Sequence, residues 1–189
     1  LEGAPLWSAI CSLVRDPTLI LAVLANMLSI SLGYCFQYAA AWSTEALGAR
    51  PQMAALTITF YSLGASVGLL FGGYVHDRLD ARGRFVSVCA YSLSTALVTC
   101  LLPAVYAANQ AAFTLPFLYT SLIIIGLCGS ILNYVTTTVY FVLVGGPTHA
   151  GTVSTFADIF GILASCLVQL TIGQLLEHRR YLAVLVLAG

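Results

Sequence analysis

The stretch from Gly72 to Arg84, GGYVHDRLDARGR, concentrates charge in an otherwise apolar chain. It holds five of the chain's fourteen charges, and more than twenty uncharged residues lie on either side of it. A short polar segment between two apolar runs of that length is typical of a loop that joins two membrane spans. A charged surface turn of a soluble protein has the same local composition, so the choice depends on the whole chain.

The composition of all 189 residues favours a membrane protein. Hydrophobic residues make up 60% of the chain and charged residues only 7%, whereas soluble domains carry about a quarter charged residues. Because the net charge is zero and lysine is absent, a basic surface for nucleic acid is excluded. The six cysteines show no C-x-x-C spacing, which favours small buried hydrophobes over disulfides or metal ligands.

The spacing of the charged and turn-forming residues predicts an all-α membrane protein with five complete spans and part of a sixth. About 20 apolar residues cross the roughly 30 Å of hydrocarbon in a bilayer. Pro51 is expected to open a helix, and Gly145-Gly146-Pro147 to end one. Because the chain begins at Leu1 with no signal peptide before the spans, we expect it to be a fragment of a longer protein or a mature piece of one. The predicted spans are 18–42, 53–75, 85–107, 115–143, 152–176 and 181–189 (partial).

The second span carries Gly64, Gly68 and Gly72 at four-residue intervals. In lipid, such a row allows a second helix to approach at backbone distance, where dispersion and weak C–H contacts hold the pair. We therefore predict close helix packing along this face.

Polar residues recur at helical spacing in three of the spans. They form the sets Asn26, Ser29, Gly33, Gln37; Gly126, Ser130, Asn133, Thr137; and Gly151, Ser154, Asp158, Gly161, Ser165, Gln169. Because polar groups facing lipid are costly, these stripes are expected either to meet one another or to line a watery cavity. Periodicity alone leaves both alternatives open.

Asp158 is the only acid well inside an apolar run. An ionised carboxylate near mid-membrane costs about 3 kcal/mol on insertion scales, so such a group usually pairs, binds a ligand or carries protons. The alternative is a protonated or helix-capping side chain that serves packing only. The sequence offers no nucleophile–base pair and no metal-ligand cluster, so we expect neither an enzyme nor a bound metal or other cofactor.

Two motifs carry a resemblance to a known family. Gly73, Asp77, Arg78, Gly83 and Arg84 match the loop between helices 8 and 9 of major facilitator superfamily transporters, with a spacing more like that of the organophosphate:phosphate antiporters. The segment 151–161, Gly-Thr-Val-Ser followed by Asp158 and Gly161, is similar to helix 11 of the sugar-phosphate exchangers in that family. The resemblance covers nearly the whole chain, as helices 7 to 11 and the start of 12.

The resemblance implies the C-terminal half of a major facilitator-type helical bundle, in a lipid bilayer and paired with a missing N-terminal half. Its function would be secondary active transport of a small organic solute, such as a sugar phosphate or glycerol phosphate, by alternating access. Bacterial members hold phosphate with an arginine in helix 7, at the place of Gly33 here. A non-transporting membrane sensor or assembly protein on the same fold is the alternative.

Within that fold, two sets of residues are the predicted site. The candidate cavity contacts are Gln37, Asn133 and Asp158, and the candidate cytoplasmic gate is the loop with Gly73, Asp77, Arg78 and Arg84.

Overall fold

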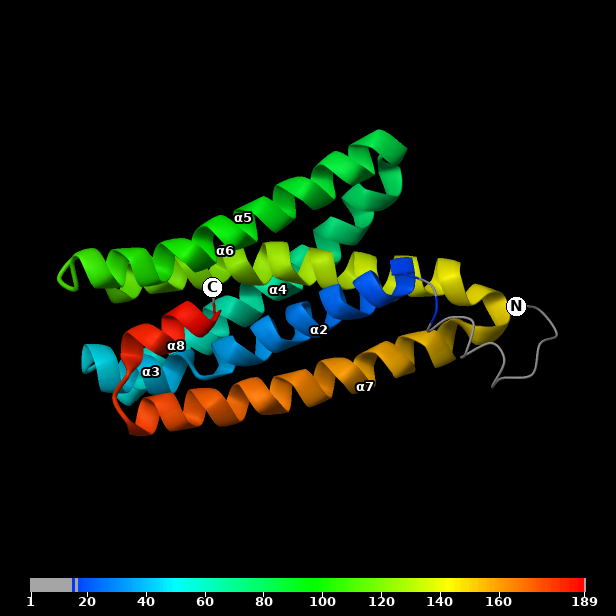
Figure 1. The fold of residues 1–189 in the computed structure, drawn as a ribbon. Helices are drawn as coiled ribbons and strands as arrows, with labels where there is room; N and C mark the ends of the chain where they lie inside the picture. The colour runs from blue at the N-terminus through cyan, green and yellow to red at the C-terminus, as the bar shows by residue number, and fades with distance from the viewer. Residues whose placement is uncertain (1–14, 16, 189) are drawn as a thin grey trace.

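The computed structural model describes Arg15 and residues 17–188, and this part of the chain is a bundle of helices without a strand (Figure 1). In chain order the elements are α2 (Pro17–Gln37), α3 (Ala39–Leu47), α4 (Pro51–Arg78), α5 (Ala81–Ala108), α6 (Leu115–Tyr134), the π-helix η1 (Val135–Tyr140), α7 (Phe141–Glu177) and α8 (Tyr181–Ala188). Five segments are long and apolar enough to cross a membrane: α2, α4, α5, α6 and His149–Glu177 of α7. The predicted all-α class with five membrane-length helices is confirmed, and α8 begins where the sixth run was predicted.

The first predicted span, 18–42, is interrupted at Tyr38. The Tyr38 N–H donates to the carbonyl of Cys35 at 3.1 Å, which tightens the chain into a turn between α2 and α3. Beyond it, Trp42 is buried, and its indole N–H donates to the carbonyl of Tyr181 at 3.1 Å. A tertiary contact therefore anchors α3, and a uniformly apolar sequence does not reveal the break.

The fourth predicted span, 115–143, also differs in its second half. The α-helix ends at Tyr134 and continues as η1, a π-helix, before α7 begins. Gly146 then has φ 61° and ψ −172°, a backbone conformation that is essentially restricted to glycine. The predicted turn at Gly145-Gly146-Pro147 is thus confirmed as a kink at Gly146, which separates η1 and the start of α7 from the long span that follows.

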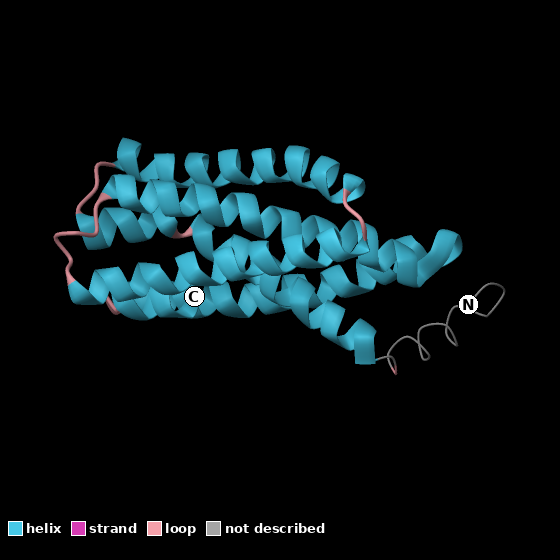
Figure 2. Cartoon of the chain, turned by 90° about the horizontal axis from the view of Figure 1, so that it is seen from above, coloured by secondary structure: helices cyan, strands magenta, loops and turns pink. Residues whose placement is uncertain are grey.

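Consecutive long helices run in opposite directions, and their connections gather at two ends (Figures 1 and 2). The α3–α4, α5–α6 and α7–α8 connections lie at one end, which we call the three-loop end. The α4–α5 connection and the Gly146 kink lie at the other end. α6 packs against both α4 and α5, and α2 runs along α7. The α4–α6 and α2–α7 pairs are the two most extensive helix contacts.

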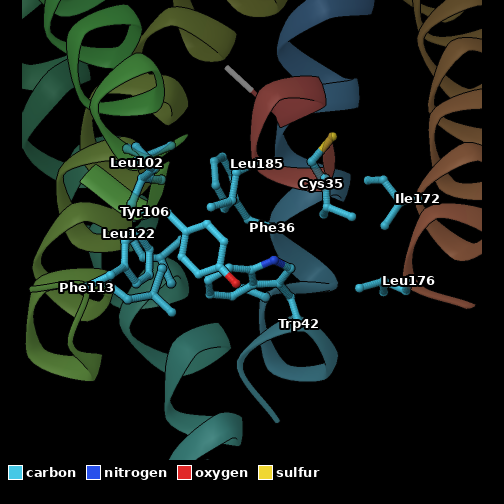
Figure 3. Packing of buried hydrophobic residues seen from close by; sticks show 14 residues of the cluster. Cys35, Phe36, Trp42, Leu102, Tyr106, Phe113, Leu122, Ile172, Leu176 and Leu185 are labelled. Atoms are coloured by element: carbon cyan, nitrogen blue, oxygen red, sulfur yellow. The ribbon is translucent and has the colours of Figure 1, made fainter. Parts of the chain in front are cut away.

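An aromatic cluster fastens the three-loop end. The ring of Trp42 lies 5.4 Å from that of Tyr106 and 5.3 Å from that of Phe113, and both contacts are edge-to-face. Figure 3 shows Trp42 between Tyr106 and Phe113 on one side and Ile172 and Leu176 of α7 on the other. Edge-to-face aromatic pairs add to the stabilisation from area burial, so this cluster ties α3, α5, α7 and the start of α6 together.

The glycine row of α4 faces α6. A methyl group added at Gly64 or Gly68 would overlap the backbone carbonyl of Ile123 or Leu127, and one at Gly72 would overlap the side chain of Ile131. The close helix packing predicted from this row is therefore confirmed, and its partner is α6.

We predict that Gly64→Ala destabilises the protein by about 1–3 kcal/mol, because the added methyl group must push two backbones apart. Gly129→Ala on α6 is the matched control, since nothing lies within 4 Å of a Cβ placed there. Gly129→Ala should be neutral or slightly stabilising through its higher helix propensity. Unfolding in detergent or lipid measures both, and equal losses in the two variants would contradict the close α4–α6 approach.

Candidate functional site

Asp158 lies on the side of α7 that packs against α2. The amide Nδ2 of Asn26 donates to Asp158 Oδ1 at 3.2 Å. Asn26 is fully buried, whereas Asp158 is only partly buried. The polar stripes of the first and fifth spans therefore meet each other at this contact. This was one of the two alternatives left open by the sequence; the other was a watery cavity. A few residues further along the same helix pair, a methyl group at Gly161 would overlap the side chain of Ile30.

The stripe of the fourth span meets α4. The Ser130 hydroxyl donates to the carbonyl of Ala65 at 3.0 Å and lies at 3.1 Å from the carbonyl of Leu127 in its own helix. A methyl group at Gly126 would overlap the carbonyl of Tyr61. This part of the stripe therefore forms a helix–helix contact.

The three predicted cavity residues occupy different places. Gln37 is exposed at the end of α2, and Asn133 is partly buried near the end of α6, next to the π-helix. Gln37 lies eleven residues beyond Asn26, or roughly 16 Å along the helix axis. The structure thus brings Asp158 together with Asn26 and not with Gln37. The sequence named Asn26 only as one member of a stripe, because the register of α2 against α7 cannot be derived from periodicity.

Gly33 allows a close contact between α2 and α4. A Cβ at Gly33 would lie 3.1 Å from the hydroxyl oxygen of Tyr61, and the Tyr61 ring stacks on Phe36 at 5.7 Å. A larger side chain at position 33 would have to displace this tyrosine.

In the charged stretch, Arg84 closes the end of α4. α4 continues to Arg78 and α5 begins at Ala81, so the connection consists of Leu79 and Asp80 only. The Arg84 Nε donates to the carbonyls of His76 (3.1 Å) and Leu79 (3.0 Å). Its Nη2 donates to the carbonyl of Asp77 at 3.3 Å. A helix end leaves its last carbonyls without partners from a following turn, and here the His76 carbonyl also accepts the Leu79 N–H at 3.3 Å.

Two other charged residues of the stretch make local contacts. The Asp80 carboxylate accepts the Gly83 N–H at 2.8 Å and caps the start of α5. The Arg78 guanidinium lies 3.8 Å from the centre of the Tyr74 ring. Asp77 is exposed, and no ion pair to it is present in the part of the chain that the structure describes. Of the predicted gate residues, Asp77 thus keeps its carboxylate available for a partner.

Gly73, the first residue of the predicted gate, faces α6. A Cβ there would lie 3.4 Å from the ring of Tyr134, which is ordinary contact distance. Gly73 is buried, so it continues the close α4–α6 packing of Gly64, Gly68 and Gly72 to the end of the helix.

The described residues hold no group of three or more His, Cys, Asp or Glu side chains that would suit a metal ion. Their five cysteines are free, and the sixth, Cys11, lies outside the described residues. An open pocket of about 430 Å³ at the three-loop end is lined by Glu45, Leu176, Glu177, Arg179 and Tyr181. Glu177 is nineteen residues from Asp158, or roughly 28 Å along α7, so this pocket is separate from the Asp158 site.

Comparison with known proteins gives no match: no protein family, curated protein or solved structure resembles the chain at a significant level.

We predict that Arg84→Lys loosens the α4–α5 connection, because an ammonium group cannot reach several carbonyls with the fixed fork of a guanidinium. The loss of these hydrogen bonds, one part-buried and two exposed, should cost about 1 kcal/mol. Deuterium uptake in peptides spanning 77–84 should accelerate accordingly.

Arg82→Lys is the control, because Arg82 is also exposed in this stretch and makes no such bond. Identical uptake in the two variants would show that Arg84 does not hold the helix end.

Proposed function

We propose that this chain is a multi-pass membrane protein and forms the C-terminal half of a major facilitator-type secondary transporter. Its substrate is a small organic solute, and the resemblance to sugar-phosphate exchangers makes phosphorylated sugars and glycerol phosphate the first candidates. Transport proceeds by alternating access around a site between this half and an N-terminal half.

The observation that carries the proposal is the pattern of helix pairing. Treat α2, α4 and α5 as one unit of three helices and α6, α7 and α8 as a second. The second helix of the first unit, α4, packs on the first helix of the second unit, α6. In the same way, the second helix of the second unit, α7, packs on the first helix of the first unit, α2. α2 and α6 run in opposite directions (Figure 1). Major facilitator halves are built from such nested inverted repeats of three helices, so the pairing supports the proposed fold.

The location of the arginines bears on substrate binding. The arginines of the described residues all lie at helix ends or in connections: Arg15, Arg78, Arg82 and Arg84 at the α4–α5 end, and Arg50, Arg179 and Arg180 at the three-loop end. Under the positive-inside rule this small excess favours the α4–α5 end on the cytoplasmic side. Cations that would hold a phosphate group in mid-membrane must then come from the N-terminal half.

Exchange in vesicles tests the proposal. The full-length protein is reconstituted, the vesicles are loaded with inorganic phosphate, and uptake of labelled glycerol phosphate or sugar phosphate is measured. We expect uptake that depends on the internal anion, since an antiporter returns to its starting state only when loaded. Binding of the labelled solute without any flux would favour the sensor alternative and contradict the proposal.

We predict that Asp158→Asn lowers exchange or alters its pH dependence, because it removes the ionisable group from the α2–α7 contact. The asparagine keeps the size and hydrogen-bonding capacity but cannot ionise. A reduction of about 5- to 150-fold corresponds to typical coupling free energies between sites. Protein abundance should stay near normal. Exchange equal to that of the parent at every pH would leave Asp158 with a packing role only.

We also predict that Asp77→Asn changes the balance between inward-facing and outward-facing states by about two- to fivefold. This corresponds to the 0.3–1 kcal/mol with which an exposed carboxylate interacts with a helix N-terminus. Such a contact shifts the equilibrium only if it differs between the two states.

Accessibility labelling of single cysteines from the two sides of the membrane measures that balance. Asp80→Asn is the matched control, because it also removes one carboxylate from the charged stretch while asparagine caps a helix equally well. An unchanged labelling pattern in Asp77→Asn, with normal flux, would contradict a gate at this loop.

A further inference from the structure

Asn26 has a buried polar atom that its surroundings do not satisfy. Its Nδ2 donates to Asp158 Oδ1, but its Oδ1 has no hydrogen-bond partner among the residues that the structure describes. The side chain is fully buried near the middle of α2. An orphaned acceptor at such a site is costly because water cannot reach it. A donor for Asn26 Oδ1 is therefore needed.

Asp158 supplies that donor if its carboxyl group carries a proton. A carboxylic acid and a primary amide have complementary edges: the amide N–H donates to the acid C=O, and the acid O–H donates to the amide C=O. The first of these two hydrogen bonds is in place at 3.2 Å. An ionised Asp158 offers acceptors only, and would leave the amide oxygen beside a negative charge.

The opposite orientation of the Asn26 amide leads to the same result. With Oδ1 turned toward Asp158, two oxygen atoms would face each other at hydrogen-bond distance, and only a proton between them makes that contact favourable. In both orientations of the amide, a proton on Asp158 would complete the contact with Asn26.

Within the described residues, the helices packed on α7 carry no charged side chain that would hold Asp158 ionised. In the described ranges, α2, α6, η1 and α8 contain no Asp, Glu, His, Lys or Arg. The titratable groups of the elements packed on α7 are Tyr34 and Cys35 of α2, Tyr140 of η1 and Tyr181 of α8, and α7 itself carries His149, Cys166 and Glu177.

We propose that Asp158 and Asn26 form a proton-binding pair that closes the contact between α2 and α7. One proton from the aqueous phase adds to the carboxylate of Asp158, whose charge becomes zero, and the resulting O–H donates to Asn26 Oδ1. When the two helices separate and water enters, the same proton returns to water and Asp158 ionises. The packed helix pair therefore binds the proton and the hydrated pair releases it, which links proton binding to a conformational equilibrium. A role of this pair in transport rests on the proposed function, whereas the Asn26–Asp158 contact itself does not.

Infrared spectroscopy of the protein in lipid tests the pair without any transport measurement. A protonated carboxyl group gives a C=O stretching band separate from that of a carboxylate, and this band moves to higher frequency when its hydrogen bonds are removed. We expect such a band at neutral pH. It should shift on ¹³C labelling of the aspartate carboxyl groups and disappear in Asp158→Asn. Glu177→Gln, which removes an exposed carboxyl group from the same helix, should retain it.

The partner is identified by a second variant. Asn26→Leu should shift the Asp158 band to higher frequency, whereas Gln174→Leu, which removes an exposed amide from α7, should leave it in place. If Asn26→Leu does not fold, Asn26→Thr provides the comparison, since it cannot form the paired acid–amide contact. A spectrum without an Asp158 acid band at neutral pH, or a band that the Asn26 variants do not move, would overturn the proposal.

Exchange measurements on the same samples separate this inference from the transport function. An Asp158 acid band in a protein without exchange activity would keep the proton pair and reject transport. Exchange without the band would keep transport and reject the pair.

Discussion

The need to satisfy polar groups inside an apolar bundle governs this structure. A polar atom on a membrane-length helix has no water to bind, so another helix must supply its partner or approach closely enough to exclude lipid. Two helix pairs meet this need in different ways. α4 and α6 meet over a row of glycines, with the Ser130 hydroxyl donating to a backbone carbonyl of α4. α2 and α7 meet at Asn26 and Asp158, where the amide is buried completely and the acid only in part. The remaining helices pack around these two pairs.

The two ends of the bundle differ in a way that matters for conformational change. At the three-loop end, the aromatic cluster around Trp42 joins four elements. At the other end, the α4–α5 connection is closed by hydrogen bonds from one arginine to backbone carbonyls, and Gly146 and the π-helix interrupt the adjoining span. π-helical segments and glycine kinks frequently occur at functional hinges.

Much of the architecture could be predicted from the sequence because lipid imposes simple rules. The length of the uncharged runs predicts the five spans, and the four-residue spacing of Gly64, Gly68 and Gly72 predicts a close helix contact. The break at Tyr38 and the π-helix after Tyr134 could not be predicted, because contacts with distant residues and local backbone geometry determine them. The same limit applies to the site. Periodicity places Asn26 and Asp158 on polar stripes, but only the relative register of α2 and α7 pairs them. Gln37 lies on the same helix as Asn26, roughly 16 Å further along its axis, and so does not reach this pair.

That register is the central claim, and disulfide cross-linking tests it most directly. Cysteines are introduced in pairs into a variant without native cysteines, and the protein is oxidised in its membrane. Ile30→Cys with Gly161→Cys should cross-link rapidly, because positions 30 and 161 face each other. A methyl group at position 161 would overlap the Ile30 side chain, and the smaller cysteine at position 30 removes that overlap. Ile30→Cys with Ile159→Cys should not, since Ile159 lies on an exposed part of α7. Equal cross-linking of both pairs, or none in the first pair, would contradict the α2–α7 register and with it the Asn26–Asp158 site.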